Sequence, residues 1–486
     1  MYMTRIKTPI ALAVRRAFFA AAALALFPGS GSCAPAEPTC APAGCNILVI
    51  VVDCLRADHL SLYGYGRKTS PNIDAFAGEA AVFTRAASQA PTTLLSFASI
   101  FTSREVSSHG VDGWDKALGD SALTLAGILK IYNYHTAAFV GGLNLNPLFG
   151  LDQGFGTYSQ INRTDASFKD TLPAALQWAV EKAAKKEKFF LVAHGNDLHT
   201  PYVFPAPALY DRGYKVRSGL ASLSGNEAMV FAAYKRKLRL GKTGQVVTLT
   251  GDETAHYVAR YDEGINYADG LLGGFFSGLR AAKLLDDTIV VLTADHGEGL
   301  FDHDYFFHDF NLYEDTLRVP LVIRVPGLGR REISRRVQLI DLMPTLLDLA
   351  GIAPPEGAQG RSLKPLLAGQ EPGPGFDRDI FSESGVGGKV IRSGKWKLIR
   401  YPGRTELYDL EKDPGELNDL AGTEKAVAAD LEKKLAARLA ADKKNQLGEP
   451  LPASGKFAAD MKRDNAYQKK FYERIPSLVG LGSAAE

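Results

Sequence analysis

The chain has 486 residues, 46% of them hydrophobic and 23% charged, and its mean hydropathy is close to zero. This balance excludes a disordered polymer and a protein with many membrane spans, and it is typical of a large globular enzyme or binding protein. Lys and Arg number 56 against 54 Asp and Glu, and four of these bases lie in the first 33 residues, so the rest carries a net charge of only −2. A nearly neutral body gives no reason to expect a nucleic acid as partner.

The first 33 residues have the features of a secretory signal. Four bases and no acid occur in this segment, and the uncharged apolar run 17–27 is followed by Pro, Gly and small residues. The run is too short to cross a hydrocarbon core of ~30 Å as a helix, although an uncleaved anchor is the alternative. Arg15 and Arg16 resemble a twin-arginine signal, and Cys33 is a candidate for lipidation, with simple cleavage as the alternative. We therefore expect an exported protein, periplasmic or extracellular, that meets a membrane only through a possible lipid anchor at Cys33.

All four cysteines fall within the first 54 residues, so no disulfide framework supports the body. Residues 34–45 are expected to form a linker. Cys40 and Cys45 stand close enough within it to pair in an oxidising compartment.

Apolar runs and helix-like stretches then alternate along the chain. The runs rich in β-branched residues are 46–52, 135–140, 189–193, 288–293 and 319–325. The stretches with helical character are 122–131, 171–184, 257–284 and 341–350. Continuous apolar runs of this length are typical of strands buried on both faces. The alternation predicts an α/β fold with a doubly wound, mostly parallel sheet flanked by helices, over residues 46–367.

The pattern changes after the Gly/Pro-rich segment 368–376. Short runs at 389–392 and 396–401, joined by Gly-containing turns, predict a small antiparallel sheet. The helix that should follow over 426–441 carries Leu431, Leu435 and Leu439 on one stripe. We expect a C-terminal subdomain over 376–442 and a polar tail over 443–486.

Polar residues follow several of the predicted strands, at the sheet edge where ligands of such folds bind. Asp53 follows the first strand, and Asp295 and His296 follow the run 288–293. A carboxylate and an imidazole side by side suit zinc or manganese better than calcium. An unpaired buried carboxylate is costly, so either a metal or Arg56 must compensate Asp53.

Motifs spread over residues 46–420 resemble the sulfatase family, in the alkaline phosphatase superfamily. The matching segments are VVDCLRADHLSLYGY from residue 51, HTPY at 199–202, YDEGINYAD at 261–269, TIVVLTADHGEGLFDH at 288–303, LYEDTLRVPLVI at 312–323, LIDLMPTLLDLAGI at 339–352 and ELYDLEKDPGELNDLA at 406–421. Their order and spacing are specific to this family. The resemblance implies an alkaline-phosphatase-like α/β fold.

The family's nucleophile belongs to a pattern similar to C-x-P-S-R-x-x-L-x-T-G, in which Cys or Ser becomes formylglycine. Thr93 stands at that position here, and Leu95 and Phe97 replace the Pro and the Arg. Threonine cannot become formylglycine. Relatives with a threonine nucleophile act at phosphorus, so the resemblance implies a phosphoester substrate. A helix N-cap is the alternative interpretation of Thr93.

Two further departures concern cations that hold sulfate in the family. A family lysine and histidine would fall at Gly142 and Asn144, and another family lysine is missing from HDFNLYE at 308–314. These substitutions count against sulfate-ester hydrolysis by the formylglycine route.

The resemblance also implies roles for individual residues. Asp53, Thr93, Asp295 and His296 would hold one divalent metal ion, with zinc or manganese favoured and calcium possible. His199 would contact the transferred group or act as an acid. His308 would contact the substrate or leaving group, or bind a second metal, with a packed histidine as the alternative. Asn144 and Lys397 are candidates for substrate contact, against an exposed strand lysine as the alternative for Lys397.

These features together predict an exported, metal-dependent hydrolase or transferase that cleaves a phosphodiester or phosphomonoester with Thr93 as nucleophile. One alternative is an arylsulfatase-like hydrolase without formylglycine, and another is a catalytically impaired binding protein on the same fold. The expected partner is a small anionic ester, such as one carried by a lipid or glycan head group. The sequence indicates no oligomeric state.

Overall fold

The computed structural model describes residues 44–447 with short gaps, together with 451–452. The gaps are 164, 201, 203–204, 206–208, 218–219, 221–232, 235, 240–245 and 374. The predicted signal, Cys33 and Cys40 lie outside the described residues, as does most of the polar tail. Cys45 is disulfide-bonded.

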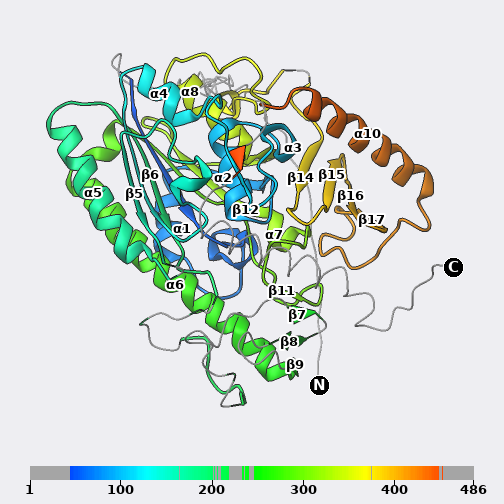
Figure 1. Cartoon of the computed structure of the whole chain (residues 1–486). Coiled ribbons are helices and arrows are strands. Elements are labelled where there is room, and N and C mark those ends of the chain that lie inside the picture. The colour runs from blue at the N-terminus through cyan, green and yellow to red at the C-terminus, as the bar shows by residue number, and fades with distance from the viewer. Residues whose placement is uncertain are drawn as a thin grey trace, which may run out of the picture. The chain divides into compact units, whose positions relative to one another are not determined.

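A central sheet of eight strands has the order β13-β2-β12-β10-β1-β6-β4-β5 (Figure 1). Its strands are β1 (Asn46–Val52), β2 (Ala81–Ala87), β4 (His135–Gly141), β5 (Thr157–Ile161), β6 (Phe189–Gly195), β10 (Thr288–Ala294), β12 (Arg318–Arg324) and β13 (Arg331–Gln338). The run β10-β1-β6-β4-β5 is parallel throughout. All residues of β1, β6 and β10 are buried, because helices cover both faces of the sheet. The predicted doubly wound, mostly parallel fold is confirmed.

The sheet departs from the expected pattern on one side. β12 runs antiparallel to β10 and to β2, while β13 pairs with β2 in parallel at the edge. The sequence pattern did not reveal β2 or β13, because both carry arginines within otherwise apolar or mixed segments. Charged side chains are usual on an edge strand such as β13, whereas β2 lies between β13 and β12.

Two helical layers enclose the central sheet. α1 (Pro71–Ala77), α5 (Phe168–Ala184) and α6 (Gly251–Ala281) pack together on one face. The other face carries α2 (Thr93–Thr102), α4 (Leu125–Ile131) and α8 (Leu342–Leu349). α5 and α6 begin earlier than predicted, because Ser167 with Asp170 and Thr250 with Glu253 form capping boxes that satisfy the first free amides.

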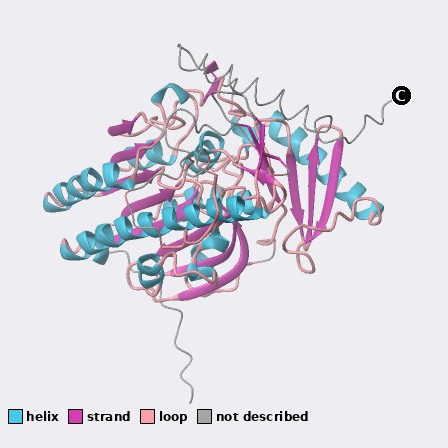
Figure 2. Cartoon of the chain, turned by 90° about the horizontal axis from the view of Figure 1, so that it is seen from below, coloured by secondary structure: helices cyan, strands magenta, loops and turns pink. Residues whose placement is uncertain are grey.

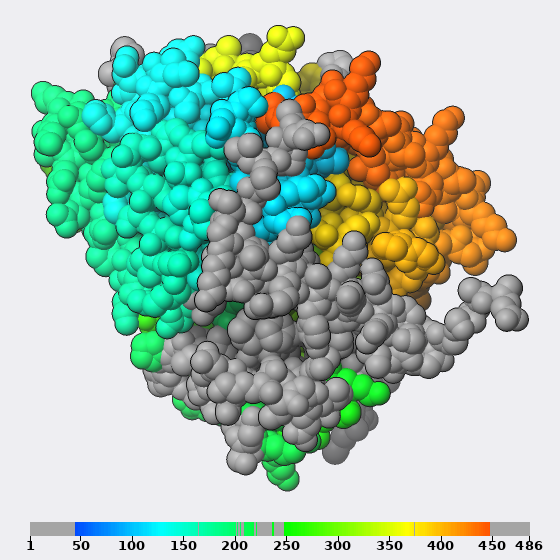
Figure 3. Space-filling view, in the orientation of Figure 1, coloured from blue at the N-terminus to red at the C-terminus, as the bar shows by residue number. Residues whose placement is uncertain are grey.

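The predicted C-terminal sheet and helix are also confirmed. The antiparallel strands β14 (Ile380–Glu383), β15 (Lys389–Ser393), β16 (Trp396–Tyr401) and β17 (Arg404–Asp409) lie side by side, with α10 (Lys425–Lys444) along them (Figure 2). The surfaces of these strands and of α10, in yellow and orange, adjoin in Figure 3. Leu431 and Leu435 are buried against the sheet, and Leu439 packs at the margin of the same cluster.

The remaining elements are short. They are α3 (Val106–His109), α7 (Glu314–Leu317), α9 (Lys364–Leu367), β3 (Lys116–Ala117), β7 (Ala233–Tyr234), β8 (Lys237–Arg239), β9 (Val246–Thr248), β11 (Tyr305–Phe306), β18 (Leu451–Pro452) and the 3-10 turns η1 (Ala57–His59), η2 (Ser61–Tyr63), η3 (Pro147–Phe149), η4 (Leu284–Asp286) and η5 (Leu339–Asp341). None of the helices in the described part of the chain has the length and apolar character needed to span a membrane.

The contact between α10 and the C-terminal sheet gives a test of this packing. Leu435 is 1% exposed, so Leu435→Ala should lower the free energy of unfolding by about 2–5 kcal/mol, because it leaves a cavity. Leu417→Ala is the control, since Leu417 is 73% exposed and its loss should cost less than about 0.5 kcal/mol. Urea unfolding of both variants measures the difference, and equal stabilities would contradict the packing.

Candidate functional site

Two carboxylates emerge side by side from the middle of the central sheet. β1 and β10 pair in parallel, with Val52 opposite Ala294, so the next residue of each strand, Asp53 and Asp295, leaves the sheet at the same edge. Both side chains are buried. The adjacent β6 runs parallel to β1 and is followed by the loop that carries His199. The backbone therefore places these residues together at the carboxyl ends of the strands, as the sequence predicts.

The imidazole of His296 is the centre of the cluster. Its Nε2 lies 3.3 Å from Thr93 Oγ1, 3.5 Å from Asp53 Oδ1 and 3.5 Å from Asp295 Oδ2. Thr93 is the first residue of α2, while Thr92 occupies the N-cap position, so the N-cap interpretation of Thr93 is wrong. The structure thus brings together the four residues predicted to bind one metal.

Hydrogen bonds fix the orientation of the two residues after β10. His296 Nδ1 lies 2.8 Å from the carbonyl oxygen of Gly297, which can only accept, so Nδ1 carries the proton and the Nε2 lone pair faces the cluster. The amide of His296 donates to Asp295 Oδ1. Gly297 is required here, because a Cβ would lie 2.0 Å from the carbonyl oxygen of Asp315. A loop of this shape leaves one nitrogen and two carboxylates free to converge.

The cluster carries negative charge that the neighbouring side chains do not neutralise. Burial, and then the charge of Asp295, raise the pKa of Asp53 to about 7. Arg56 does not compensate Asp53, because its guanidinium is paired with Asp58 and Asp302 at 2.8 and 2.6 Å. That alternative from the sequence is wrong.

The donor set fits a divalent cation. Ligand atoms of Asp53, Asp295 and His296 all lie within 4.8 Å of one another, and all three residues are buried. Asp295 Oδ2 has no hydrogen-bond partner among the described residues, which is costly for a buried carboxylate unless a cation faces it. Two carboxylates with one imidazole match the ligands of zinc or manganese.

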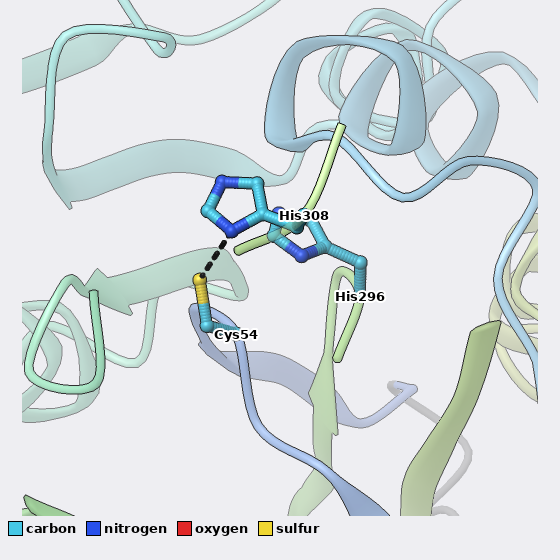
Figure 4. Close-up of side chains that lie close together, drawn as sticks. All are labelled: Cys54, His296 and His308. Carbon is cyan, nitrogen blue, oxygen red and sulfur yellow. Dashed lines mark hydrogen bonds between the residues drawn. The ribbon is translucent and has the colours of Figure 1, made fainter. Parts of the chain in front are cut away.

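His308 and His199 lie next to this cluster. The ring centroid of His308 is 4.5 Å from that of His296 and 5.1 Å from that of His199. Figure 4 shows His308 beside His296, with the thiol of Cys54 pointing at the His308 ring. Burial lowers the pKa of both His308 and His199, so both imidazoles are neutral at neutral pH.

Three residues near the histidines were not assigned a role from the sequence: Cys54, Glu298 and Asp309. Cys54 Sγ lies 3.2 Å from Asp53 Oδ1 and 3.6 Å from His308 Nδ1, so it is more than a packed apolar side chain. Glu298 Oε1 lies 3.1 Å from the same nitrogen of His308. Burial raises the pKa of Asp309 to about 7. The DHGE motif could have directed attention to Glu298. Nothing local in the sequence indicates that Asp309 is buried at the site, because its position depends on long-range packing.

Backbone strain accompanies these residues. Cys54, Phe307 and Asp309 have φ values of 60°, 84° and 81°, in the left-handed region that side chains other than glycine rarely adopt. Strain of this kind is held in place by surrounding packing and concentrates at functional sites.

The two substrate-contact candidates lie in different settings. Asn144 is half-buried and its Oδ1 accepts a hydrogen bond from the indole nitrogen of Trp114 at 3.1 Å. Lys397 is fully buried, with its Nζ 2.9 Å from Glu314 and 2.6 Å from Glu416. Both interpretations of Lys397 from the sequence are therefore wrong. Its charge compensates Glu416, which is buried in the C-terminal subdomain, and the half-buried Glu314 of α7, so it is not available to a substrate.

Replacing Lys397 tests this structural role. Lys397→Met should lower the free energy of unfolding by about 3–5 kcal/mol, because it leaves the buried Glu416 without its counter-charge, while Glu314 keeps its pair with Arg392. Lys395→Met is the matched control, since Lys395 is part-exposed and its pair with Asp409 should contribute at most about 1 kcal/mol. If Lys397→Met kept its stability and instead raised KM, the residue would contact substrate after all.

The raised pKa of Asp53 predicts a pH dependence for the metal-free protein. The folded chain holds the Asp53 proton up to about pH 7, whereas the unfolded chain loses it near the ordinary value of 3.8, so the stability from this carboxyl falls as pH rises between these values. Urea unfolding of the chelated protein at about pH 4 and about pH 8 measures this effect. The free energy of unfolding should fall more between the two pH values for the wild type than for Asp53→Asn, by a few kcal/mol at most. Equal losses would contradict the assignment.

Comparison with known proteins agrees with this architecture. Residues 45–352 match the Sulfatase family model, and residues 301–445 match the model described as N-sulphoglucosamine sulphohydrolase, C-terminal. Arylsulfatase K of Xenopus laevis is 33% identical over 200 residues, 38% of this chain and 36% of that protein. Arylsulfatase K of Danio rerio is 26% identical over 80% of this chain and 83% of its own, and an arylsulfatase of Clostridium perfringens is 26% identical over 78% and 90%.

Solved structures share the fold. A phosphonate monoester hydrolase of Agrobacterium radiobacter superposes with a TM-score of 0.68 at 22% identity, over 82% of this chain and 96% of its own. A putative sulfatase from Bacteroides fragilis gives the same TM-score at 20% identity, over 87% and 98%. Because the Sulfatase model covers more than half of the chain, the protein belongs to the sulfatase family of the alkaline phosphatase superfamily, a family of metal-dependent ester hydrolases.

Proposed function

We propose that this protein is an exported, metal-dependent hydrolase or transferase that cleaves a phosphoester with Thr93 as the nucleophile. The observation that carries the proposal is the position of the Thr93 hydroxyl. It is 3.3 Å from His296 Nε2, in a buried cluster that also holds Asp53 and Asp295. Export rests on the signal-like N-terminus, which lies outside the described residues.

A divalent cation would be held by Asp53, Asp295, His296 and the hydroxyl of Thr93, with zinc or manganese favoured over calcium. Such a cation lowers the pKa of a bound water from ~15.7 to ~7, and the same effect would make the threonine hydroxyl a nucleophile at neutral pH. The hydrogen bond from His296 Nδ1 to Gly297 keeps the imidazole in the tautomer that can bind it.

The chain's own groups then position the reaction. Thr93 lies at the N-terminus of α2, where the helix dipole stabilises negative charge on an attacked ester. Attack by Thr93 Oγ1 on phosphorus forms a threonyl phosphoester and releases an alcohol. Water or an acceptor alcohol then attacks the same phosphorus and restores the hydroxyl. Catalysis of this type depends mainly on positioning and on charge stabilisation.

His199 and His308 are suited to move protons in these steps. Both imidazoles are neutral, because burial lowers their pKa, so either can accept the proton of the incoming water or alcohol. Glu298 Oε1 and Cys54 Sγ both approach Nδ1 of His308, which orients its ring toward His199 and His296.

Phosphorus is favoured over sulfur as the reacting centre because of Thr93 and of two missing cations. Threonine cannot form the aldehyde hydrate that the family uses on sulfate. A family lysine is replaced by Gly142, and Asp309 lies in the segment where another is missing. Two of the similar structures are titled phosphonate monoester hydrolases, which supports phosphorus chemistry on this fold.

The second candidate is a sulfate-ester hydrolase that works without formylglycine. The names of the curated relatives favour it, since they are arylsulfatases. One similar structure is titled as a complex with its substrate D-glucosamine-2-N,6-O-disulfate, so a small anionic glycan ester is a reasonable substrate class for either candidate.

Replacing the proposed nucleophile is the first test. Thr93→Ala should reduce kcat by about 10³-fold or more while the metal content, measured by elemental analysis, falls by less than half. Thr93→Ser should retain measurable turnover. Thr102→Ala is the matched control in the same helix, because the Thr102 hydroxyl only donates to the carbonyl oxygen of Ala98. Full activity of Thr93→Ala would disprove the nucleophile assignment.

A substrate panel separates the two candidates. We expect kcat/KM for an aryl phosphodiester or phosphomonoester to exceed that for the matching aryl sulfate by at least about tenfold, since Thr93 replaces formylglycine. Steady-state assays on the purified, metal-loaded protein measure the ratio. A preference for sulfate that is lost in Thr93→Ala would establish the second candidate instead.

A further inference from the structure

A basic groove lies between the edge of the central sheet and the C-terminal sheet, and the proposed reaction does not use it. The groove has a volume of about 700 Å³. The bases that line it are Arg85, Arg318, Arg335, Arg336, Arg392 and Lys395. Three acids, Glu314, Asp377 and Glu411, stand against these six bases in the described lining. The surplus of three positive charges is notable in a chain whose total net charge is +2.

The fold forces like charges together at the centre of this groove. Arg85 on β2 and Arg336 on β13 are direct partners in a parallel ladder, where neighbouring strands lie about 4.8 Å apart. Like charges at facing positions destabilise a sheet. The register of the same ladder is irregular between Ile333 and Arg336, which explains how the consecutive residues Arg335 and Arg336 both line one groove. Without a ligand this arrangement carries a cost.

Arg392 brings a third guanidinium from β15. Its residue is only 6% exposed, and its Nε has no hydrogen-bond partner among the described residues. It forms an ion pair with Glu314, but Glu314 also pairs with Lys397. Burial lowers the pKa of Arg336, the charge of Asp377 raises it, and the charges of Arg392 and Arg85 lower it further, so the three guanidiniums act on one another.

Two acids of the groove are paired with arginines that line it, Glu314 with Arg392 and Asp377 with Arg335. Asp377 binds Arg335, which is 41% exposed and also pairs with Glu371. Among the described residues no ion pair reaches Arg85 or Arg336, so these two facing guanidiniums form the part of the groove where positive charge is least compensated. No aromatic side chain lines the described groove, so it offers no stacking surface for a nucleobase.

We propose that this groove binds a small anion that carries two or more phosphate or sulfate groups, through Arg85, Arg336 and Arg392. Planar guanidiniums are the preferred partners of such oxyanions, because each can donate two parallel hydrogen bonds. Three of them from three strands match a ligand with several anionic groups, and 700 Å³ is typical of a small-molecule site. The inference does not depend on the proposed function, since none of these residues belongs to the Thr93 cluster.

Calorimetric titration of the full, metal-loaded chain with inorganic tripolyphosphate, at about 150 mM NaCl, tests the proposal. The double variant Arg85→Gln with Arg336→Gln should bind at least about tenfold more weakly than wild type. The control Arg163→Gln with Arg280→Gln removes the same charge from exposed positions and should bind like wild type. Binding at the metal cluster would persist in the groove variant, so equal affinities of the two double variants overturn the proposal, as does the absence of saturable binding to wild type.

Thermal unfolding shows whether the variants are folded, and a second titration distinguishes the sources of the anion. Removing the facing arginines should leave the Tm of the free protein unchanged or higher, and tripolyphosphate should raise the Tm of wild type but not of the groove variant. Repeating the titration with a sulfated heparin disaccharide distinguishes a glycan-borne ligand from free polyphosphate by which of the two binds more tightly. A Tm rise of equal size in both proteins would contradict the assignment.

Discussion

The pairing of β1 with β10 sets the chemistry of this protein. Their parallel register places Asp53 and Asp295 at the same edge of the sheet, directly after two fully buried strands, and His296 follows Asp295. Two carboxylates that approach one another away from water repel strongly unless a cation lies between them. Burial, and then this repulsion, raise the pKa of Asp53. The fold therefore forms a buried acidic site suited to a divalent cation, and the hydroxyl of Thr93, at the start of α2, lies 3.3 Å from His296 Nε2.

Arg56, the arginine nearest to Asp53 in the sequence, does not compensate the charge of the acidic cluster. Arg56 stands three residues after Asp53, yet the turn after β1 directs its guanidinium to Asp58 and Asp302. Two further acids, Glu298 and Asp309, are buried beside His308, and burial raises the pKa of both. By contrast, the groove lined by residues of β2, β13 and β15 concentrates arginines. The chain thus carries both a buried acidic centre that suits a metal ion and a basic groove, while its net charge stays small.

Much of this could be predicted from the sequence, and the failures have physical causes. Apolar runs located β1, β6 and β10 because strands buried on both faces need no polar alternation. The same reasoning placed Asp53, Asp295 and His296 at one edge. β2 and β13 were missed because arginines interrupt their apolar pattern, and Lys397 was misjudged because a lysine buried between two acids has no local signature. Cys54 and Asp309 join the site through left-handed backbone conformations that tertiary packing imposes.

The central claim is that one divalent cation binds the hydroxyl of Thr93 together with Asp53, Asp295 and His296. An anomalous difference map from crystals of the protein grown with zinc or manganese tests it most directly. We expect one strong peak about 2.0–2.2 Å from His296 Nε2, both carboxylates and Thr93 Oγ1. A map without a peak at these residues, or with a metal that leaves Thr93 Oγ1 uncoordinated, would contradict the account.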